Sequence, residues 1–411
     1  MMNQYNFDLV IDRTKSDCAK WSADSLNSYF GKEDLLPLWV ADMDFEVAPA
    51  IKRAVVQRAE HGIYGYSTRP HAYYEAAINW IRRRFGYRVE EEWIVYSPGV
   101  VPAICNLLQA LCRKGDKVLI QEPVYYPFKA AIESNGFEVV VSELKNNGQF
   151  YEMDFEDFAE KARDPRVGVF ILCNPHNPVS RLWTRGELER IGSICLENNV
   201  VVISDEIHSD LIYPGWQHTM FASISDAFAM NSATCMSPSK TFNLAGMQAS
   251  NIIIPNGRIR DKYLAVQLQN NTELQNPFSI VASIAAYNEG EAWLEELLNY
   301  LVGNIAYIHQ YLSDNLPLAH MIDPQATYLG WIDFRAYEAD GKALENVIYH
   351  KAKVAMDGGT WFGRGGSGFM RINFACPRET LKMGLDRIAK TIHETYGSPP
   401  QSNPCNPAPA E

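Results

Sequence analysis

The sequence predicts an α/β fold built on a mostly parallel sheet, and two observations carry that prediction. Through the middle of the chain, short runs rich in valine and isoleucine alternate with segments of helical period. The short runs are apolar at successive positions, which is typical of strands that helices cover on both faces. These runs lie at 93–96, 117–120, 138–142, 167–173 and 200–204, with weaker ones at 232–237 and 250–254.

The segments between these runs carry the composition and the end signals of helices. Residues 101–113 are nearly all apolar, and a second helix is predicted over 126–135, where an Asn-Gly pair begins. A third is predicted over 184–199, because Thr184 and Glu187 have the spacing of a capping box. Helices in these places would connect parallel strands.

The last quarter of the chain has a different pattern. From about residue 290 an acidic helical stretch leads to short strands at 328–334 and 369–374, and a final helix runs to Tyr396. This order favours a smaller α+β domain that shares its core with the first fifty residues. We expect a large α/β domain over 51–289, a small α+β domain over 1–50 and 290–393, and a disordered Pro-rich tail over 394–411.

Composition narrows the class of protein. The 411 residues carry a net charge of −12, which disfavours binding to nucleic acid or to an anionic membrane. Eight cysteines occur without a C-x-x-C pair, so we expect neither a zinc site nor a disulfide framework. Neither a signal-peptide pattern nor a run of 18 apolar residues is visible. We expect a cytoplasmic enzyme that binds no metal.

A glycine-rich match needs separate consideration. Gly363, Gly365 and Gly368 fit the pattern G-x-G-x-x-G of dinucleotide-binding proteins. That motif requires a strand before it and a helix after it, whereas here the strand-like run 369–374 follows. The segment is therefore interpreted as a flexible loop that precedes a strand.

Lys240 is the most informative residue in the sequence. It is the one charged residue between Asp226 and Arg258, and small, hydroxyl and apolar residues surround it. Most lysines lie on solvated faces, but desolvation would favour the neutral amine here. A neutral lysine amine can form a Schiff base with a carbonyl group and can accept a proton.

A Schiff-base lysine indicates a carbonyl cofactor, of which pyridoxal phosphate is the commonest. Such a site needs an acid for the ring nitrogen, a donor to the ring hydroxyl and a cradle for the phosphate. Asp205 and Asn177 follow predicted strands, and the loop 97–101 precedes a predicted helix. Singly these could be a helix cap, a turn residue and an ordinary loop. Together with Lys240 they favour a cofactor site.

Several segments of the sequence resemble those of a known enzyme family. The segments N-P-H-N-P, S-D-E-I-H-S-D-L and S-P-S-K-T-F-N-L-A-G are similar to fold-type I pyridoxal-phosphate enzymes of aminotransferase class I/II. More narrowly, W-V-A-D-M-D-F at 39–45, H-G-I-Y-G-Y-S at 61–67 and S-P-G-V-V at 97–101 resemble cystathionine β-lyases of the MalY/PatB type. The similarity runs from about residue 7 to residue 393.

The resemblance implies a fold-type I homodimer with shared active sites and a small amino-acid substrate. The reaction it implies is β-cleavage of L-cystathionine or related S-substituted L-cysteines to a thiol, pyruvate and ammonia. Two alternatives stay open. The chain could be a pyridoxal-phosphate-dependent aminotransferase, or a regulatory pyridoxal-phosphate-binding protein that acts through a protein partner.

The resemblance also assigns roles to residues around the cofactor ring. Lys240 would hold the cofactor covalently and move the proton of the substrate Cα. Asp205 would keep the ring nitrogen protonated, and Tyr125 would stack on the ring. Asn177 would bond the ring hydroxyl, and His208 stands where aminotransferases often have a tyrosine that donates to it.

Phosphate and substrate contacts follow in the same way. The phosphate would be held by the amides of Val100 and Val101, the hydroxyl of Ser237 and, from the neighbouring subunit, Tyr66. Arg371 would pair with the substrate α-carboxylate through two parallel bonds. Tyr64 and Trp361 are aromatic candidates for the substrate pocket.

Besides His208, two positions depart from the wider family pattern. Gln248 stands eight residues after the lysine, where many aminotransferases have an arginine that grips the phosphate. Ser180 stands where the N-P-x-G turn usually ends in glycine. If that position requires a positive φ, the loop must differ slightly around the serine.

Overall fold

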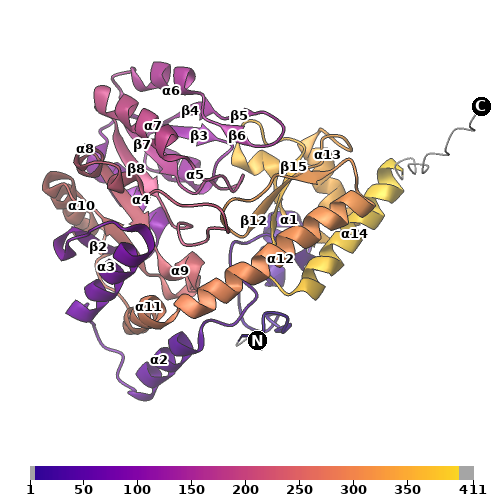
Figure 1. Ribbon diagram of the computed structural model, residues 1–411, viewed down its shortest axis with the longest axis horizontal. Coiled ribbons are helices and arrows are strands. Elements are labelled where there is room, and N and C mark those ends of the chain that lie inside the picture. Colours follow the sequence, from indigo (N-terminus) through magenta and orange to yellow (C-terminus); the bar gives the residue numbers. More distant parts are fainter. Residues whose placement is uncertain (1–4, 398–411) are drawn as a thin grey trace, which may run out of the picture.

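A computed structural model describes residues 5–397 and divides into two parts, a large sheet covered by helices and a smaller sheet beside two long helices (Figure 1). The final helix α14 (Arg378–Tyr396) is helical through residue 396, so the expected disorder over 394–411 is wrong for its first three residues. Gly397 caps this helix, and residues 398–411 lie outside the described part of the chain.

The large sheet has seven strands in the order β2-β10-β9-β8-β7-β3-β4. Only β10 runs antiparallel to its neighbours, and the four pairings among the other strands are parallel. The mostly parallel sheet is therefore confirmed. The strands are β2 (Ile94–Ser97), β3 (Lys117–Glu122), β4 (Glu138–Glu143), β7 (Val167–Cys173), β8 (Val201–Asp205), β9 (Ser232–Met236) and β10 (Ser250–Ile253).

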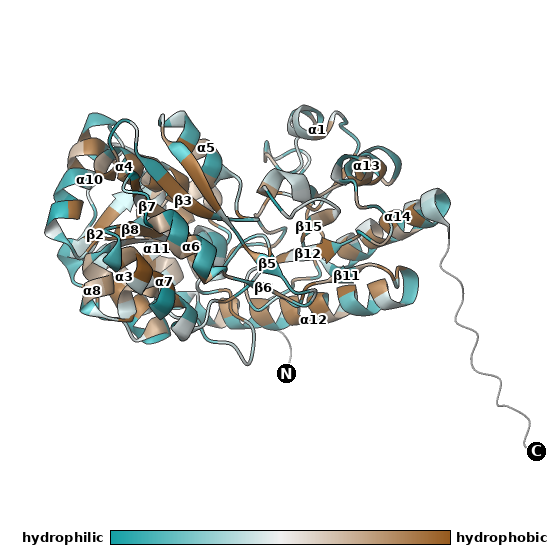
Figure 2. Cartoon of the chain, turned by 90° about the horizontal axis from the view of Figure 1, so that it is seen from above, coloured by the Kyte–Doolittle hydropathy of each residue, from teal (hydrophilic) through white to brown (hydrophobic). Residues whose placement is uncertain are grey.

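Apolar residues on both faces of these strands hold the helices in place. On β7, Val169 and Ile171 pack into the core of one face, and Phe170 and Leu172 pack into the core of the other. The first face is covered by α4 (Val100–Leu111), α5 (Pro127–Ser134) and α10 (Gly257–Gln269), and the second by α6 (Phe155–Ala162), α7 (Arg185–Glu197) and α8 (Asp226–Met230). Figure 2 shows the contrast between the apolar strands and the hydrophilic outer faces of these helices.

The predicted end signals are present. Thr184 accepts a hydrogen bond from the amide of Glu187, and the Glu187 side chain bonds the Thr184 amide, so α7 begins with the expected capping box. The three glycines at 363, 365 and 368 all have positive φ, between 75° and 96°. They lie in a loop that leads directly into β15 (Phe369–Asn373), which confirms the loop interpretation.

The smaller sheet has four antiparallel strands in the order β11-β12-β15-β14. Its strands are β11 (His320–Met321), β12 (Leu329–Asp333), β14 (Asp357–Gly358) and β15. The long helices α12 (Glu291–Asn315) and α14 pack beside it and against each other (Figure 1). Helix α13 (Gly341–Asn346) precedes the segment that leads to β14.

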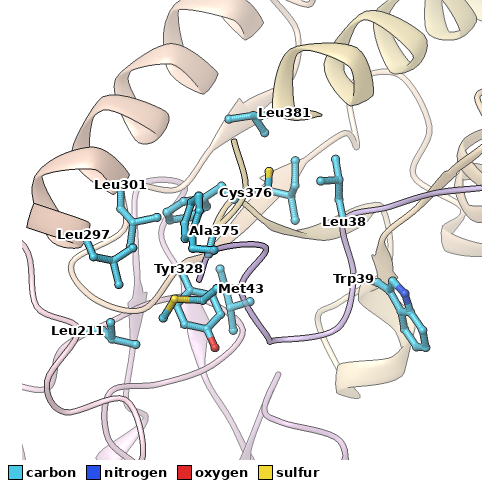
Figure 3. Packing of buried hydrophobic residues seen from close by; sticks show 14 of the residues in the cluster. Leu38, Trp39, Met43, Leu211, Leu297, Leu301, Tyr328, Ala375, Cys376 and Leu381 are labelled. Atoms are coloured by element: carbon cyan, nitrogen blue, oxygen red, sulfur yellow. The ribbon is translucent and has the colours of Figure 1, made fainter. Parts of the chain in front are cut away.

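The N-terminal segment belongs to the core of this smaller part. Figure 3 shows Leu38 and Met43 packed among apolar side chains of α12 and α14, including Leu297 and Leu381. Strand β1 (Leu36–Pro37) pairs with β13 (Val354–Ala355), although more than three hundred residues separate them. The N-terminal segment and the two long helices therefore contribute to one apolar cluster.

The remaining elements include a group of helices around α11. Helices α2 (Pro49–Glu60) and α3 (His71–Phe85) pack on α11 (Pro277–Glu289), and the four-residue α9 (Pro238–Thr241) follows β9. The other elements are α1 (Ala23–Phe30), β5 (Lys145–Asn146) and β6 (Tyr151–Glu152).

We propose that the boundaries expected from the sequence describe the two parts, with residues 51–289 in the large part and residues 1–50 and 290–393 in the smaller part. Within residues 5–397, no helix has both the length and the apolar composition needed to cross a membrane.

Candidate functional site

The candidate site is a cavity of about 200 Å³ at the carboxyl edge of the large sheet. Parallel strands place the residues that follow them at one edge, so the segments after β2, β3, β7, β8 and β9 meet there. Eight of the residues predicted from the sequence line this cavity. They are Val100, Val101, Tyr125, Asn177, Asp205, His208, Ser237 and Lys240.

Lys240 projects into the cavity from α9. Its Nζ donates a hydrogen bond of 2.5 Å to the carbonyl oxygen of Ala41. Desolvation lowers the pKa of this amine to about 8, against the opposing influence of the Asp42 and Asp205 carboxylates. Roughly a tenth of the amine is therefore neutral at pH 7, far more than for a solvated lysine, as the sequence around Lys240 predicts.

Asp205 is the last residue of β8, and it is buried. Its Oδ1 accepts a hydrogen bond of 3.1 Å from the amide of Ile207. Burial raises the pKa of the carboxyl to about 7, because this bond and the Lys240 charge compensate the desolvation only in part. A protonated ring nitrogen is the kind of partner that would complete the compensation, so the residue fits the role expected of it.

Three more predicted residues form the walls of the cavity. Burial raises the pKa of the Tyr125 phenol to about 12 and lowers the pKa of His208 well below its ordinary value, so both side chains are neutral. His208 packs edge-on against Tyr328, and among residues 5–397 its Nδ1 has no hydrogen-bond partner. Asn177 accepts a hydrogen bond of 3.0 Å from Arg371, which links the cavity to the smaller sheet.

One end of the cavity is suited to an anion. Helix α4 begins there after Gly99, and the first amides of any helix have no acceptor within the helix. The Ser237 hydroxyl donates to the carbonyl of Ala249 at 2.6 Å and accepts from the amide of Ser239 at 3.0 Å. Ser239, which also lines the cavity, was not singled out from the sequence although it stands one position before the lysine.

The donors and acceptors in this cavity therefore fit pyridoxal phosphate. The amides of Val100 and Val101 at the start of α4 are available to a phosphate, and the Asp205 carboxyl could supply a counter-charge for the ring nitrogen. The desolvated amine of Lys240 is available for a Schiff base. Gln248 lines the same cavity with a left-handed backbone (φ +54°) and adds no positive charge.

Arg371 lies on β15 and is almost fully buried. Besides its bond to Asn177, its Nη2 donates to the carbonyl of Trp39 at 3.2 Å and forms an ion pair with Asp357, its cross-strand neighbour on β14. Sequence reasoning missed Asp357. The signal for it was a single carboxylate inside the otherwise apolar and small run V-A-M-D-G at 354–358.

The segment 39–45 crosses the cavity beside Lys240, and charged residues hold it there. Arg13 bonds both oxygens of Asp42, at 3.1 and 2.8 Å, and the buried Lys20 bonds Asp44 at 2.7 Å. The hydroxyl of Tyr328 donates to the carbonyl of Ala41 at 2.8 Å, so this carbonyl has two donors. None of these supporting contacts was predicted from the sequence, because each joins residues far apart in the chain.

Ser180 adopts the conformation that its position in the turn requires. Its φ is +53°, in the region that favours glycine, and its hydroxyl bonds Thr327 Oγ1 at 2.6 Å and the carbonyl of Leu329. The serine therefore holds a conformation that glycine adopts more readily, and its side chain ties the loop to the start of β12.

Tyr64 and Tyr66 do not reach the cavity of their own chain. Tyr66 is 97% exposed, and Tyr64 is 55% exposed with its hydroxyl on the carbonyl of Ala59. Trp361 does not line the cavity either. It stacks on Phe30 and packs edge-on against Tyr126, the residue after Tyr125.

Comparison with known proteins gives a consistent result. Residues 33–388 match the family model described as aminotransferase class I and II. The chain is 45% identical to the cystathionine beta-lyase PatB of Bacillus subtilis, over 94% of this chain and 100% of PatB. It is 33% identical to the protein MalY of Escherichia coli, over 94% of this chain and 99% of MalY.

Solved structures agree with these relatives. Cystalysin from Treponema denticola, whose crystal structure contains pyridoxal 5'-phosphate, matches with a TM-score of 0.92 at 34% identity, over 95% of this chain and 99% of cystalysin. The pyridoxal-phosphate-bound C-S lyase from Staphylococcus hominis matches with a TM-score of 0.87 at 36% identity, over 95% of this chain and all of that one.

Proposed function

The chain belongs to the aminotransferase class I and II family, and from that premise we propose that it is a pyridoxal-phosphate-dependent carbon–sulfur β-lyase of the cystathionine β-lyase type. It cleaves the Cβ–S bond of L-cystathionine or a related S-substituted L-cysteine, and the products are a thiol, pyruvate and ammonia. The observation that carries the proposal is the desolvated amine of Lys240 in one cavity with the Asp205 carboxyl and the first amides of α4.

The cofactor would be held by groups at two ends of the cavity. The amides of Val100 and Val101 would hold its phosphate, together with the hydroxyl of Ser237 once this turns from the Ala249 carbonyl, and the Asp205 carboxylate would pair with its ring nitrogen. Tyr125 would cover the ring, and Asn177 and His208 would bond the ring hydroxyl. When bound, pyridoxal phosphate supplies an electron sink for the electron pair left on the substrate Cα.

Lys240 moves the proton that starts the reaction. With a pKa of about 8, roughly a tenth of its amine is neutral at pH 7, and this form can take the proton from Cα. The resulting ammonium holds that proton within the cavity, where the departing sulfur can accept it. The carbonyl of Ala41 fixes the direction of the amine through its hydrogen bond.

Arg371 binds the α-carboxylate and so fixes the substrate. Its guanidinium is held by Asn177 on the cavity side and by the Trp39 carbonyl on the other. A carboxylate held by two parallel bonds cannot rotate, which keeps the Cα–H and Cβ–S bonds in a defined orientation.

The active unit is proposed to be a homodimer. Large apolar side chains are exposed on the 63–66 loop and near α10, among them Ile63, Tyr66, Leu268 and Leu274. A second copy covering this surface would bury them and bring Tyr66 of the partner subunit to the phosphate.

We place the protein in the reducing cytoplasm, since the seven cysteines among the described residues form no disulfide.

The test is release of pyruvate from L-cystathionine by the purified, cofactor-loaded protein without any keto-acid acceptor. Pyruvate in large molar excess over enzyme is expected, because β-elimination regenerates the cofactor at every turnover. A single change of cofactor absorbance that stops after one equivalent, without pyruvate, would contradict the proposal and indicate transamination.

A further inference from the structure

The hydrogen bonds of Arg371 leave neither edge of its guanidinium group fully free to bind a substrate carboxylate. A guanidinium holds a carboxylate through two parallel N–H bonds, along the edge Nε/Nη2 or the edge Nη1/Nη2. Both edges include Nη2. The two hydrogens of Nη2 are directed at the carbonyl of Trp39 and at the carboxylate of Asp357, while among residues 5–397 Nε has no partner.

Asp357 is the acceptor that can leave. The carbonyl of Trp39 is fixed, because the Trp39 indole bonds the carbonyl of Lys20 at 3.0 Å and its ring packs against Phe30. Asp357 lies on β14, the two-residue edge strand of the smaller sheet, and holds Arg371 through a side chain that can rotate. An incoming carboxylate therefore competes with Asp357.

We propose that Asp357 determines how the substrate is bound: it competes with the substrate α-carboxylate for Nη2 of Arg371, and binding of that carboxylate is coupled to the uptake of one proton by Asp357. The inference rests on the proposed function, in which Arg371 receives the α-carboxylate.

The charge balance explains the proton. In the free protein Arg371 and Asp357 carry opposite charges, and both are almost fully buried. A bound carboxylate leaves two negative charges against one positive charge in that place, and a buried charge without a partner is costly. Oδ1 of Asp357 already has no hydrogen-bond partner among the described residues. A proton taken from solvent forms one O–H bond on Asp357 and restores neutrality.

Among the neighbouring groups, only a second carboxyl could take up a proton in place of Asp357. Burial raises the pKa of Asp357 to about 6 against the opposing charge of Arg371, so the free carboxyl is ionised above that pH. Tyr125, Tyr126 and Tyr349 surround the pair, and burial raises the pKa of each phenol, which keeps them neutral. Glu345 on α13 is the other carboxyl nearby, and burial raises its pKa as well.

The experiment uses the cofactor-loaded protein and 3-(methylthio)propionate, which has the carboxylate and thioether of a substrate but no amine to react. Affinity is followed by tryptophan fluorescence, and proton uptake by calorimetry in buffers of different ionisation heat. Between pH 6.5 and 7.5 we expect the affinity to fall about tenfold, with close to one proton taken up per molecule bound.

Asp357→Asn is expected to bind the probe with less than a twofold change over this pH range and with no proton uptake. Its KM for L-cystathionine at pH 8 should fall while kcat stays the same. Glu345→Gln is the matched control, since it removes the other carboxyl and should keep the pH dependence. If the pH dependence persists in Asp357→Asn, or if the unmodified protein takes up no proton, the proposal is wrong.

Two further measurements distinguish failure of this proposal from misfolding of the variant and from failure of the lyase function. The cofactor absorbance of Asp357→Asn reports whether that variant is folded. If it is not folded, the number of protons that the unmodified protein takes up on binding the probe still tests the proposal. Pyruvate release is recorded independently. Its absence would overturn the lyase function, whereas proton-coupled binding of the probe would still be measurable.

Discussion

The amine of Lys240 lies 2.5 Å from the carbonyl oxygen of Ala41, a residue 199 positions earlier in the chain. Ala41 belongs to the N-terminal segment of the smaller part, so this segment lines the cavity together with residues at the edge of the large sheet. The same carbonyl accepts a bond from Tyr328, and Arg13 and Lys20 hold the aspartates that follow it. The position of the amine is therefore set by three separate regions of the chain.

Replacing Lys240 with alanine should lower pyruvate release by about a thousandfold or more, because both the covalent attachment point and the proton acceptor are lost. Cofactor should still bind without a covalent bond, which equilibrium dialysis measures. Lys262→Ala on the exposed face of α10 is the control and should keep full activity. Full activity in Lys240→Ala would contradict the assignment.

The cofactor-free protein should show the lowered pKa of Lys240 directly. Only the neutral amine attacks an aldehyde, so the rate of pyridoxal phosphate attachment should rise about tenfold per pH unit below pH 8 and level off above it. N-acetyl-lysine methylamide, whose amine is solvated, should continue to gain rate up to about pH 10. A rate that levels off only near pH 10 in the protein would show that desolvation does not lower this pKa.

Asp205→Asn should weaken cofactor binding by about ten- to a hundredfold and lower the rate as well, because a buried ring cation loses its counter-charge. Dialysis against a series of pyridoxal phosphate concentrations gives the affinity. Asp261→Asn, a change on the exposed face of α10, is the control. Unchanged cofactor affinity in Asp205→Asn would exclude the proposed pairing with the ring nitrogen.

Ser180 offers a test of the loop. Ser180→Ala keeps a Cβ at φ +53° but loses the hydroxyl bonds to Thr327 and Leu329, whereas Ser180→Gly loses the bonds and also relieves the backbone. We expect both variants to unfold at lower denaturant concentration than the natural chain. Alanine should be less stable than glycine by about 1 kcal/mol. The reverse order would show that the backbone at this position is not strained.

Some features of the fold could be predicted because they depend on local pattern. The alternation of apolar runs with helical segments indicated the parallel sheet, and the spacing of Thr184 and Glu187 marked the start of α7. The isolation of Lys240 among uncharged residues indicated a desolvated amine. The end of the final helix at Tyr396 was also predicted, although the expected start of the tail at residue 394 overlapped its last turn.

The sequence by itself determined which chemical groups stand at the ends of the parallel strands, because chain direction places those ends at one edge of the sheet. It could not determine which groups compensate one another across the two parts of the molecule. The pairing of Asp357 with Arg371, the bond from Lys240 to Ala41 and the exposed position of Tyr66 were decided by the tertiary structure. Burial and charge compensation depend on distances in space, and no local pattern of residues specifies those distances.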